Sequence, residues 1–513
     1  MRACTGLRLR NPAAARGGFV PVEDDGCKRG AAQFPVAPLG YRGDATFPTG
    51  SPTRGVHVSS PDPSVPPAAE SQTFSPRYTL YVLVLVLLTM VFNNIDRTML
   101  SIVVEDVKSE FQLSDTEIGF LLGPAFAIVY VFLVLPVGRY ADTVGARRSI
   151  ISTCLFLWSL FTLATGFVSS YAQLALMRMG VGVGVGEAGA TAPAVSMLSD
   201  YLPPERRARG MSVISMGAVI GMGIGMMAGG WISQSFGWRG SFIAAGIPGI
   251  VLAIVFRLTV REPPRGGSEG RTSSEAGDFL PNLKALFGTR TYLFILSANA
   301  FTLFASMGRN LWEPAFLMRT YEMGQFHAGT WYFLTSPLPS MLGIFLGGYF
   351  ADRFGANDKR WYLWVPALGL LISPPILVAF LLWPTTHMIQ MPGFLAGTMF
   401  AVMPVALLWS VVGSVLGGWF TAPFMSTTQG VVPLRMRAFA AAISTLLSTL
   451  IGLAGGPLVV GALADALAPE YGTDALRYAL LFPTLIPMIS GVICLAGASR
   501  VAADLERSRT FDG

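Results

Sequence analysis

Two short stretches of the chain carry the same pattern, GRYADTVGARR at residues 138–148 and GYFADRFGANDKR at residues 348–360. In each stretch a glycine lies four residues before an aspartate, a second glycine lies three residues after it, and two basic residues follow. Both stretches come directly after a long apolar run. A pattern repeated at corresponding places indicates that the two halves of the chain share one architecture.

These two apolar runs belong to a series of twelve, each long enough to cross a bilayer as a helix of about 20 residues. They lie near residues 78–103, 116–137, 148–169, 172–198, 208–232, 240–260, 291–318, 328–350, 361–383, 395–426, 438–464 and 475–498. The run at 395–426 is too long for one straight span and contains Gly417, Gly418 and Pro423, so we expect a break there. The series predicts an all-α membrane protein of twelve transmembrane helices, arranged as two pseudo-symmetric six-helix bundles.

The composition supports a membrane protein and argues against nucleic-acid binding. Of the 513 residues, 52% are hydrophobic and 13% are charged, whereas a soluble domain carries about a quarter charged residues. The net charge of +6 comes from short basic clusters between apolar runs, as in cytoplasmic loops. We therefore expect no nucleic-acid partner. The four cysteines show no metal or disulfide spacing, and we expect no cofactor and no metal.

The distribution of charge also predicts the orientation in the membrane. Basic clusters follow the second, fourth, sixth, eighth and tenth runs, whereas the loop after the first run is acidic, with Glu105, Asp106 and Glu110. Loops rich in Lys and Arg remain in the cytoplasm. We therefore expect a multi-pass integral membrane protein with both termini cytoplasmic, in the inner membrane if the source is bacterial.

The runs divide the chain into five parts. Residues 1–76 are rich in Pro, Gly, Ala, Ser and Arg, which predicts a disordered cytoplasmic tail, or a start assigned too far upstream. The other parts are a first six-helix bundle, a polar cytoplasmic linker, a second bundle and a cytoplasmic C-terminal tail, at 77–261, 262–288, 289–499 and 500–513.

The pattern at 138–148 resembles the loop 2–3 signature of the major facilitator superfamily, and the resemblance extends over about residues 77–500. The signature residues are Gly138, Arg139, Asp142, Gly145, Arg147 and Arg148, and the second copy keeps Asp352 and Gly355. The resemblance implies that Asp142 caps or pairs with a neighbouring helix and acts as a conformational latch that holds the outward-open state. The other interpretation is that these basic loops only orient the protein.

Three further segments are similar to bacterial Spinster-like proteins. They are Asn93-Asn94-Ile95-Asp96-Arg97, the glycine-rich stretch from Arg178 to Gly189, and Trp312-Glu313-Pro314. This narrower resemblance implies a carrier of sphingosine phosphate or lysophospholipids.

Ionisable residues well inside the predicted spans are candidates for function, because a charge there is costly unless it is paired or hydrated. They are Asp96, Arg97, Arg178, Glu187, Arg309 and Glu313. At a rise of about 1.5 Å per residue, Asp96 and Arg178 each lie about 10 Å from the outer ends of their spans. They could therefore meet, either as part of a proton pathway or only as a contact that fastens two helices together.

Glu187 lies near the midplane, where a carboxylate could take up and release a proton. It follows Arg178 by nine residues, or about 900° of helix, so the two should face opposite directions unless the glycine-rich stretch twists the helix. Arg309 and Glu313 are four residues apart and share one helix face. Together with Asn310, they either bind an acidic head group or form an intrahelical pair.

These features predict a secondary active transporter that works by alternating access, is coupled to protons and moves a lipid-like amphiphile. We expect a monomer whose partners are this substrate, protons and membrane lipids. No phosphate-binding loop or catalytic constellation occurs in the sequence, so neither ATP as the energy source nor an enzyme is expected. The alternative is a carrier of small hydrophilic solutes or drugs, and a more remote one is a membrane sensor without transport.

Overall fold

The computed structural model describes residues 74–144, 146–185, 191–202, 204–263, 279–390, 393, 400–433 and 436–512. These residues lie in one compact unit, Pro67–Gly513. The predicted N-terminal tail up to residue 73, and residues 264–278 of the predicted linker, lie outside the described residues. The description below therefore concerns the membrane-spanning part of the chain.

The first half of the chain consists of eight helices in the described residues. They are α1 (Pro76–Ile102), α2 (Val104–Phe111), α3 (Asp115–Leu122), α4 (Pro124–Val144), α5 (Arg147–Thr165), α6 (Tyr171–Val185), α7 (Thr191–Tyr201) and α8 (Pro204–Thr259). Helix α8 contains two spans, because Gly237 adopts φ 77° and reverses the direction of the chain. A glycine suits this position because a side chain disfavours a left-handed backbone.

The second half is also helical, apart from one pair of short strands. Its helices are α9 (Phe279–Gly288), α10 (Arg290–Tyr321), α11 (Gln325–Thr335), α12 (Pro337–Gly355), α13 (Trp361–Leu382), α14 (Ala406–Gly417), η2 (Gly418–Phe420), α15 (Thr421–Gly430), α16 (Arg437–Thr449), η4 (Leu450–Gly455), α17 (Gly456–Tyr471), η5 (Gly472–Asp474), α18 (Ala475–Ala479), α19 (Leu481–Leu485) and α20 (Pro487–Asp512). Strand β1 (Met388–Gln390) pairs antiparallel with β2 (Val402–Pro404), and Met388 lies opposite Pro404.

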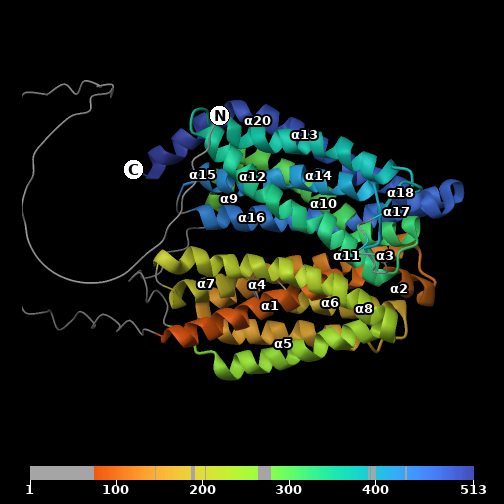
Figure 1. Ribbon diagram of the computed structural model, residues 1–513. Helices are drawn as coiled ribbons and strands as arrows, with labels where there is room; N and C mark the ends of the chain where they lie inside the picture. The colour runs from red at the N-terminus through yellow and green to blue at the C-terminus, as the bar shows by residue number, and fades with distance from the viewer. Residues whose placement is uncertain are drawn as a thin grey trace, which may run out of the picture. The chain divides into compact units, whose positions relative to one another are not determined.

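Twelve spans result from this order of helices. Nine stretches of the described residues are long and apolar enough to cross a membrane. Two of them, Gly210–Thr259 and Phe439–Arg507, reverse direction and each supply two spans, and α6 with α7 supplies one more. Figure 1 shows the result as two bundles, with α1 to α8 in one and α10 to α20 in the other. The predicted fold class is confirmed.

The predicted break in the tenth span is present, but the start of that span is not where the sequence placed it. The α-helix ends at Gly417 and continues through the 3-10 turn η2 into α15, so the break lies at the two glycines and Pro423 falls within α15. The span begins at Ala406 and not at 395, because Val402–Pro404 forms strand β2 outside it. Apolar composition alone cannot distinguish such a strand from the first turn of a helix.

Other spans break where the sequence predicted continuous helices. The second and eighth spans break before Pro124 and Pro337, whose rings remove a backbone donor. The eleventh span contains the π-helical segment η4, a form that is frequent at functional sites.

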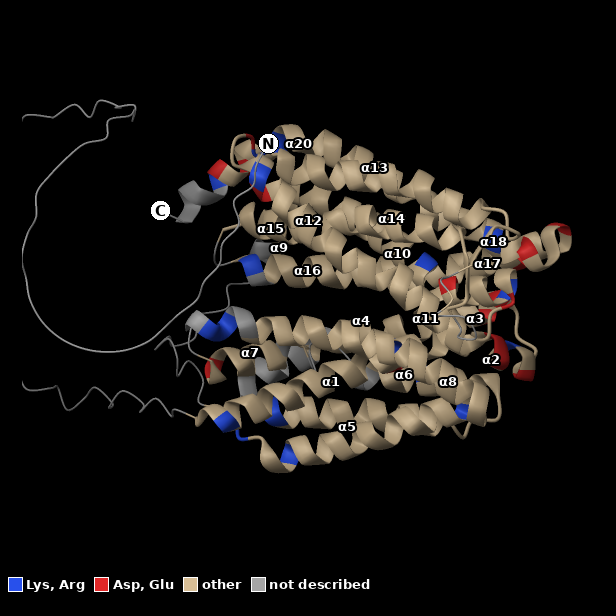
Figure 2. Cartoon of the chain, viewed as in Figure 1, with Lys and Arg blue, Asp and Glu red and all other residues tan. Residues whose placement is uncertain are grey.

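Charge is distributed unevenly between the two ends of the bundles. We call the end where α1 begins and α20 ends the terminal end, and the opposite end the far end. Figure 2 shows basic residues at the terminal ends of α1, α5, α16 and α20, and acidic residues gathered at the far end on α2 and around α17 and α18. The predicted orientation, in which the terminal end is cytoplasmic, is based on this same asymmetry and remains a prediction.

Candidate functional site

A cavity of about 310 Å³ lies between the two halves, and we call it the central cavity. Its wall in the first half includes Asn94, Arg97 and Thr98 of α1, Phe126 of α4, Arg178 of α6, and Met222 and Met226 of α8. The second half contributes Leu303, Met307, Asn310, Leu311, Tyr332, Ser448, Thr449 and Leu453. Both halves therefore line one space, as alternating access requires.

A second cavity of about 280 Å³ adjoins it, lined mostly by the second half and also by Ala218, Val219 and Met222 of α8, and we call it the side cavity. The two cavities share Met222, Asn310 and Tyr332. Arg309 and a group of serines, including Ser336, Ser340, Ser373 and Ser414, line the side cavity. It is therefore richer in small hydroxyl groups than the central cavity.

Asp96 and Arg178 lie side by side, as the sequence predicted, but they meet through different atoms. The guanidinium Nη1 of Arg178 donates to the backbone carbonyl of Asp96 at 3.5 Å, and both residues are buried. The structure thus joins α1 to α6 at this level without a direct ion pair between the two side chains.

Arg97 points its charge at the central cavity. Its guanidinium carbon lies 5.4 Å from the centre of the Phe126 ring, within the range of a cation–π contact. Its Nε is buried and has no hydrogen-bond partner among the described residues. With Arg178, it gives the wall of the cavity in the first half two cations beside the buried carboxylate of Asp96.

Arg309 and Glu313 form an ion pair of 3.0 Å along α10, and the Glu313 side chain is fully buried. Ser336 accepts from Arg309 at 3.4 Å, and Ser410 donates to Glu313 at 3.4 Å. Arg309 also lines the side cavity, and Asn310 lines both cavities. The intrahelical pair predicted from the four-residue spacing is therefore present, and its arginine also faces a cavity.

The remaining predicted site residues are only partly covered by the structure. Glu187 and Gly145 lie outside the described residues. Gly138, Arg139 and Asp142 lie in the last turns of α4. The proton-site role of Glu187 and the latch role of Asp142 remain predictions.

Arg147 is the centre of a buried charge cluster at the terminal end of the first half. It forms ion pairs with Asp200 at 2.5 Å and with Glu262 at 2.8 Å, and it donates to the carbonyl of Pro263. The Glu262 carboxylate also accepts from the backbone N–H of Arg148 at 2.7 Å. The start of α5 is thereby fastened to α7 and to the end of the sixth span.

Sequence reasoning missed both acidic partners of Arg147. Asp200 and Glu262 each lie just beyond the predicted cytoplasmic end of a span, so a search for acids at those ends would have found them.

In the second copy of the motif, Asp352 is exposed and accepts from the hydroxyl of Tyr362 at 3.2 Å. A Cβ at Gly355 would lie 2.6 Å from the Tyr362 ring, so this glycine allows the close approach.

At the far end, Arg319 of α10 joins the two halves. Its guanidinium binds both carboxylate oxygens of Asp115 of α3, at 2.8 and 2.7 Å, and Glu105 of α2 at 2.8 Å. Lys108 adds an ion pair with Asp115 at 2.5 Å. A two-pronged arginine–carboxylate contact is among the strongest side-chain interactions. The acidic loop that sequence analysis used only for orientation is therefore a contact surface for the second half.

Asp465 of α17 makes the second link at the far end. It accepts from the backbone N–H groups of Asp115 and Thr116, at 2.9 and 2.7 Å, and so caps the first turn of α3 from the other half. Asp106 accepts from Ser233 of the first half and from Gln325 of the second, at 3.0 and 2.6 Å. We call Arg319, Asp465 and Asp106 with their partners the far-end contacts, and they close the far end.

Glu110 keeps the loop of the far-end contacts in place on the first half. Arg239 of α8 donates to both of its oxygens at 2.7 Å, and the indole of Trp238 donates to one at 2.7 Å. The hydrogen bonds from Arg239 hold the pKa of the Glu110 carboxyl below its ordinary value. These contacts fix α2 on α8 within the first half, and other residues of α2 contact the second half.

Comparison with known proteins points to one family. Residues 86–415 match the sequence model of the Major Facilitator Superfamily. An MFS-type efflux pump of Mycolicibacterium smegmatis is 31% identical over 404 residues, which are 78% of this chain and 88% of that protein. Protein spinster homolog 1 of Xenopus tropicalis is 26% identical over 509 residues, which are 94% and 93% of the two chains.

A solved structure gives the same result. The crystal structure of a bacterial homologue of the human lysosomal transporter Spinster, in an inward-facing and unoccupied conformation, has a TM-score of 0.73 to this chain and 27% identity. The alignment covers 84% of this chain and 99% of that structure.

Proposed function

Because this chain belongs to the Major Facilitator Superfamily and resembles its Spinster members, we propose that it is a proton-coupled secondary transporter of a lipid-like amphiphile with an acidic head group. The observation that carries the proposal is the composition of the central cavity, in which two arginines share a wall with methionine and aromatic side chains.

The apolar part of the cavity suits a hydrocarbon chain. Phe126, Met222, Met226, Met307 and Leu311 line it, and methionine adapts its shape to flexible ligands. Arg97 and Arg178 supply positive charge to the same space, and a guanidinium matches the geometry of phosphate and carboxylate groups. A lysophospholipid has one chain and one phosphate, and so satisfies both parts of the wall.

The proton pathway that we propose starts at Asp96. Its carboxylate is buried beside Arg178 and next to the cavity, so binding of an acidic head group to the arginine would change the balance of charge around it. Glu187 is the second candidate from the sequence, and the Arg309–Glu313 pair is a third.

The conformational cycle that we propose exchanges contacts between the two ends. The terminal end lies in the cytoplasm, and the far-end contacts close the outer side. When they break and the halves rock around the central cavity, the latch residues around Asp142 would hold the cytoplasmic side closed. The cluster around Arg147 keeps the helix ends of the first half together during this movement.

The test is uptake and binding with the purified protein in liposomes. We expect lysophosphatidylglycerol to bind, and glucose not to bind, with Arg97→Gln weakening lysolipid affinity about tenfold because one charged hydrogen-bond partner is lost. Arg360→Gln, an exposed arginine outside both cavities, should leave affinity unchanged. An imposed proton gradient should drive uptake, and an uncoupler should abolish it. Undiminished uptake with the uncoupler would overturn proton coupling.

Drug export is the second candidate, and the M. smegmatis relative named as an efflux pump favours it. A cationic drug would require an acidic wall in place of the two arginines. Binding of ethidium that competes with lysophosphatidylglycerol, and that persists in Arg97→Gln, would favour this function over lipid transport.

A further inference from the structure

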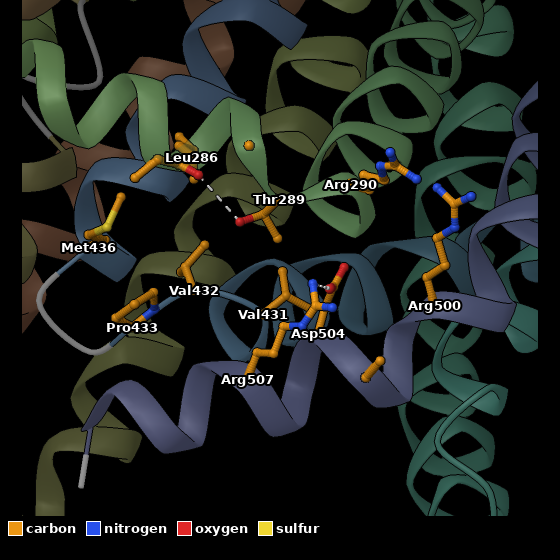
Figure 3. Close-up of a pocket in the computed structure, with 13 residues that line it drawn as sticks. Leu286, Thr289, Arg290, Val431, Val432, Pro433, Met436, Arg500, Asp504 and Arg507 are labelled. Carbon is orange, nitrogen blue, oxygen red and sulfur yellow. Dashed lines mark hydrogen bonds and ion pairs between the residues drawn. The ribbon is translucent and has the colours of Figure 1, made fainter.

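A cavity of about 820 Å³ opens at the terminal end of the second half, and it shares no lining residue with the central or side cavity. Figure 3 shows its walls, which come from the end of α9, the start of α10, the chain after α15 and the last turns of α20. We call it the terminal pocket. Nothing in the proposed transport cycle uses it.

The terminal pocket carries an excess of positive charge. Arg290, Arg500 and Arg507 line it, and Asp504 is the acidic lining residue. Asp504 already accepts from the backbone N–H of Thr291 at 3.1 Å and lies 3.7 Å from Arg507. The Asp504 carboxylate therefore interacts with the start of α10 and with its own helix, and it does not neutralise Arg290 and Arg500.

Arg290 and Arg500 line the same pocket, and Figure 3 shows their guanidinium groups pointing toward one another. Both side chains are exposed, and among the described residues neither has an anionic partner. The Arg500 guanidinium also lies 5.9 Å from the centre of the Phe294 ring, which limits where it can point. Two adjacent cations repel one another, so an anion held between them lowers the energy of both.

The rest of the terminal pocket is apolar. Leu286, Val431, Val432 and Met436 line it and are buried. On α20, the exposed Ile489 lies eleven residues before Arg500, so the two share a helix face and are separated by about 16 Å of apolar surface. An exposed apolar face of α20 therefore leads away from the two arginines toward the far end.

We propose that the terminal pocket binds the phosphate of an anionic phospholipid, with Arg290 and Arg500 on the phosphate and the acyl chains along α20. Arginine forks bind phosphate oxygens in pairs. The cytoplasmic leaflet, where we place this end, is rich in anionic lipids, and basic pockets between helices on that side bind their head groups.

The test measures lipid binding to the full chain in micelles by native mass spectrometry. We expect dioleoylphosphatidylglycerol to bind and dioleoylphosphatidylcholine to bind at least about tenfold more weakly, because only the first carries a net charge. The double variant Arg290→Ala with Arg500→Ala should lose at least about tenfold in affinity for phosphatidylglycerol. The matched control is Arg360→Ala, an exposed arginine at the same end, which should bind as the parent does.

Two further arms make the result decisive. The variant Arg290→Lys with Arg500→Lys keeps the charges and should recover part of the binding, which also checks that the loss in the alanine variant is not caused by unfolding. Inorganic phosphate should not compete with phosphatidylglycerol at millimolar concentration. Full competition by phosphate would overturn a lipid site in favour of a free-anion site, and unchanged lipid affinity in the alanine variant would overturn the pocket altogether.

Discussion

Arg178 is buried in the first half, and its guanidinium contacts the backbone carbonyl of Asp96, which is also buried. The contact that the structure shows is to the carbonyl of Asp96, so an amide in place of the carboxylate keeps that hydrogen bond. What an amide removes is the negative charge and the ability to exchange a proton. Replacing Asp96 with an amide should therefore affect transport more than stability.

We expect Asp96→Asn to abolish gradient-driven uptake, because the residue can no longer exchange a proton. The fold should lose less than the about 3–5 kcal/mol that follows the breaking of a direct buried ion pair. Uptake in liposomes and the melting temperature measure the two effects, with Glu506→Gln, an exposed carboxylate on α20, as the control. Full uptake by Asp96→Asn would place the proton site elsewhere, and Glu187 would then be the first candidate.

Breaking the Arg309–Glu313 pair should cost more stability than Asp96→Asn does, because its two side chains contact each other directly. Glu313→Gln leaves Arg309 in a largely buried position without its carboxylate, and we expect a loss of about 3 kcal/mol in stability. Replacing both residues with glutamine should be less damaging than the single change, since no unpaired charge remains. A double-mutant cycle on melting in detergent measures this coupling, and additive effects would show that the pair contributes no coupling energy.

Helices α3 and α17 meet across the two halves through glycines. A Cβ at Gly119 would lie 2.6 Å from the carbonyl oxygen of Pro457, and one at Gly461 would lie still closer to the carbonyl of Asp115. In both cases the neighbour is backbone, which cannot move aside as a side chain can. The far end can therefore close only because these helices lack side chains where they touch.

We expect Gly461→Ala to favour the conformation that is open at the far end. Overpacking costs about 1–3 kcal/mol and acts only when α3 touches α17, so the closed population should fall about tenfold. A cysteine introduced at Met226 in the central cavity should react faster with an impermeant maleimide added from the far side. Gly229→Ala is the control, because a Cβ there would meet its nearest neighbour at 3.6 Å. Equal rates in both variants would contradict the proposed role of this contact.

Arg319 joins the two halves at the far end. From α10 it contacts Asp115 and Glu105 of the first half, so its loss removes three charged hydrogen bonds between the bundles. Arg477 of α18 lies at the same end, but it donates to the carbonyls of Leu381 and Trp383 within the second half. Substituting each arginine in turn therefore distinguishes the loss of the contact between the bundles from a general disturbance of the far end.

We expect Arg319→Gln to lengthen the distance between spin labels placed at Ser235 of α8 and Glu470 of α17. The closed state loses a buried network of about 3–5 kcal/mol, which is enough to reverse a two-state population. Arg477→Gln should leave the distance distribution as in the parent protein. Double electron–electron resonance measures both, and an unchanged distribution in Arg319→Gln would mean that the glycine contact and Asp465 suffice for closure.

The sequence by itself determined the number of spans, their order and the break at Gly417 and Gly418. These features depend on apolar length and on the local chemistry of glycine and proline, which require no distant partner. The intrahelical pair of Arg309 and Glu313 was predictable for the same reason, since four residues always bring two side chains to one helix face.

Which charges meet between helices depends on how the helices pack in three dimensions. A helix turns by about 100° per residue, so its rotation about its own axis selects the partner, and that rotation is set by packing against the neighbours. For this reason Arg178 reaches the carbonyl of Asp96 and not its carboxylate, Arg147 meets Asp200 and Glu262, and Arg319 crosses to Asp115. The rotation of each helix about its axis cannot be read from the spacing of residues along the chain.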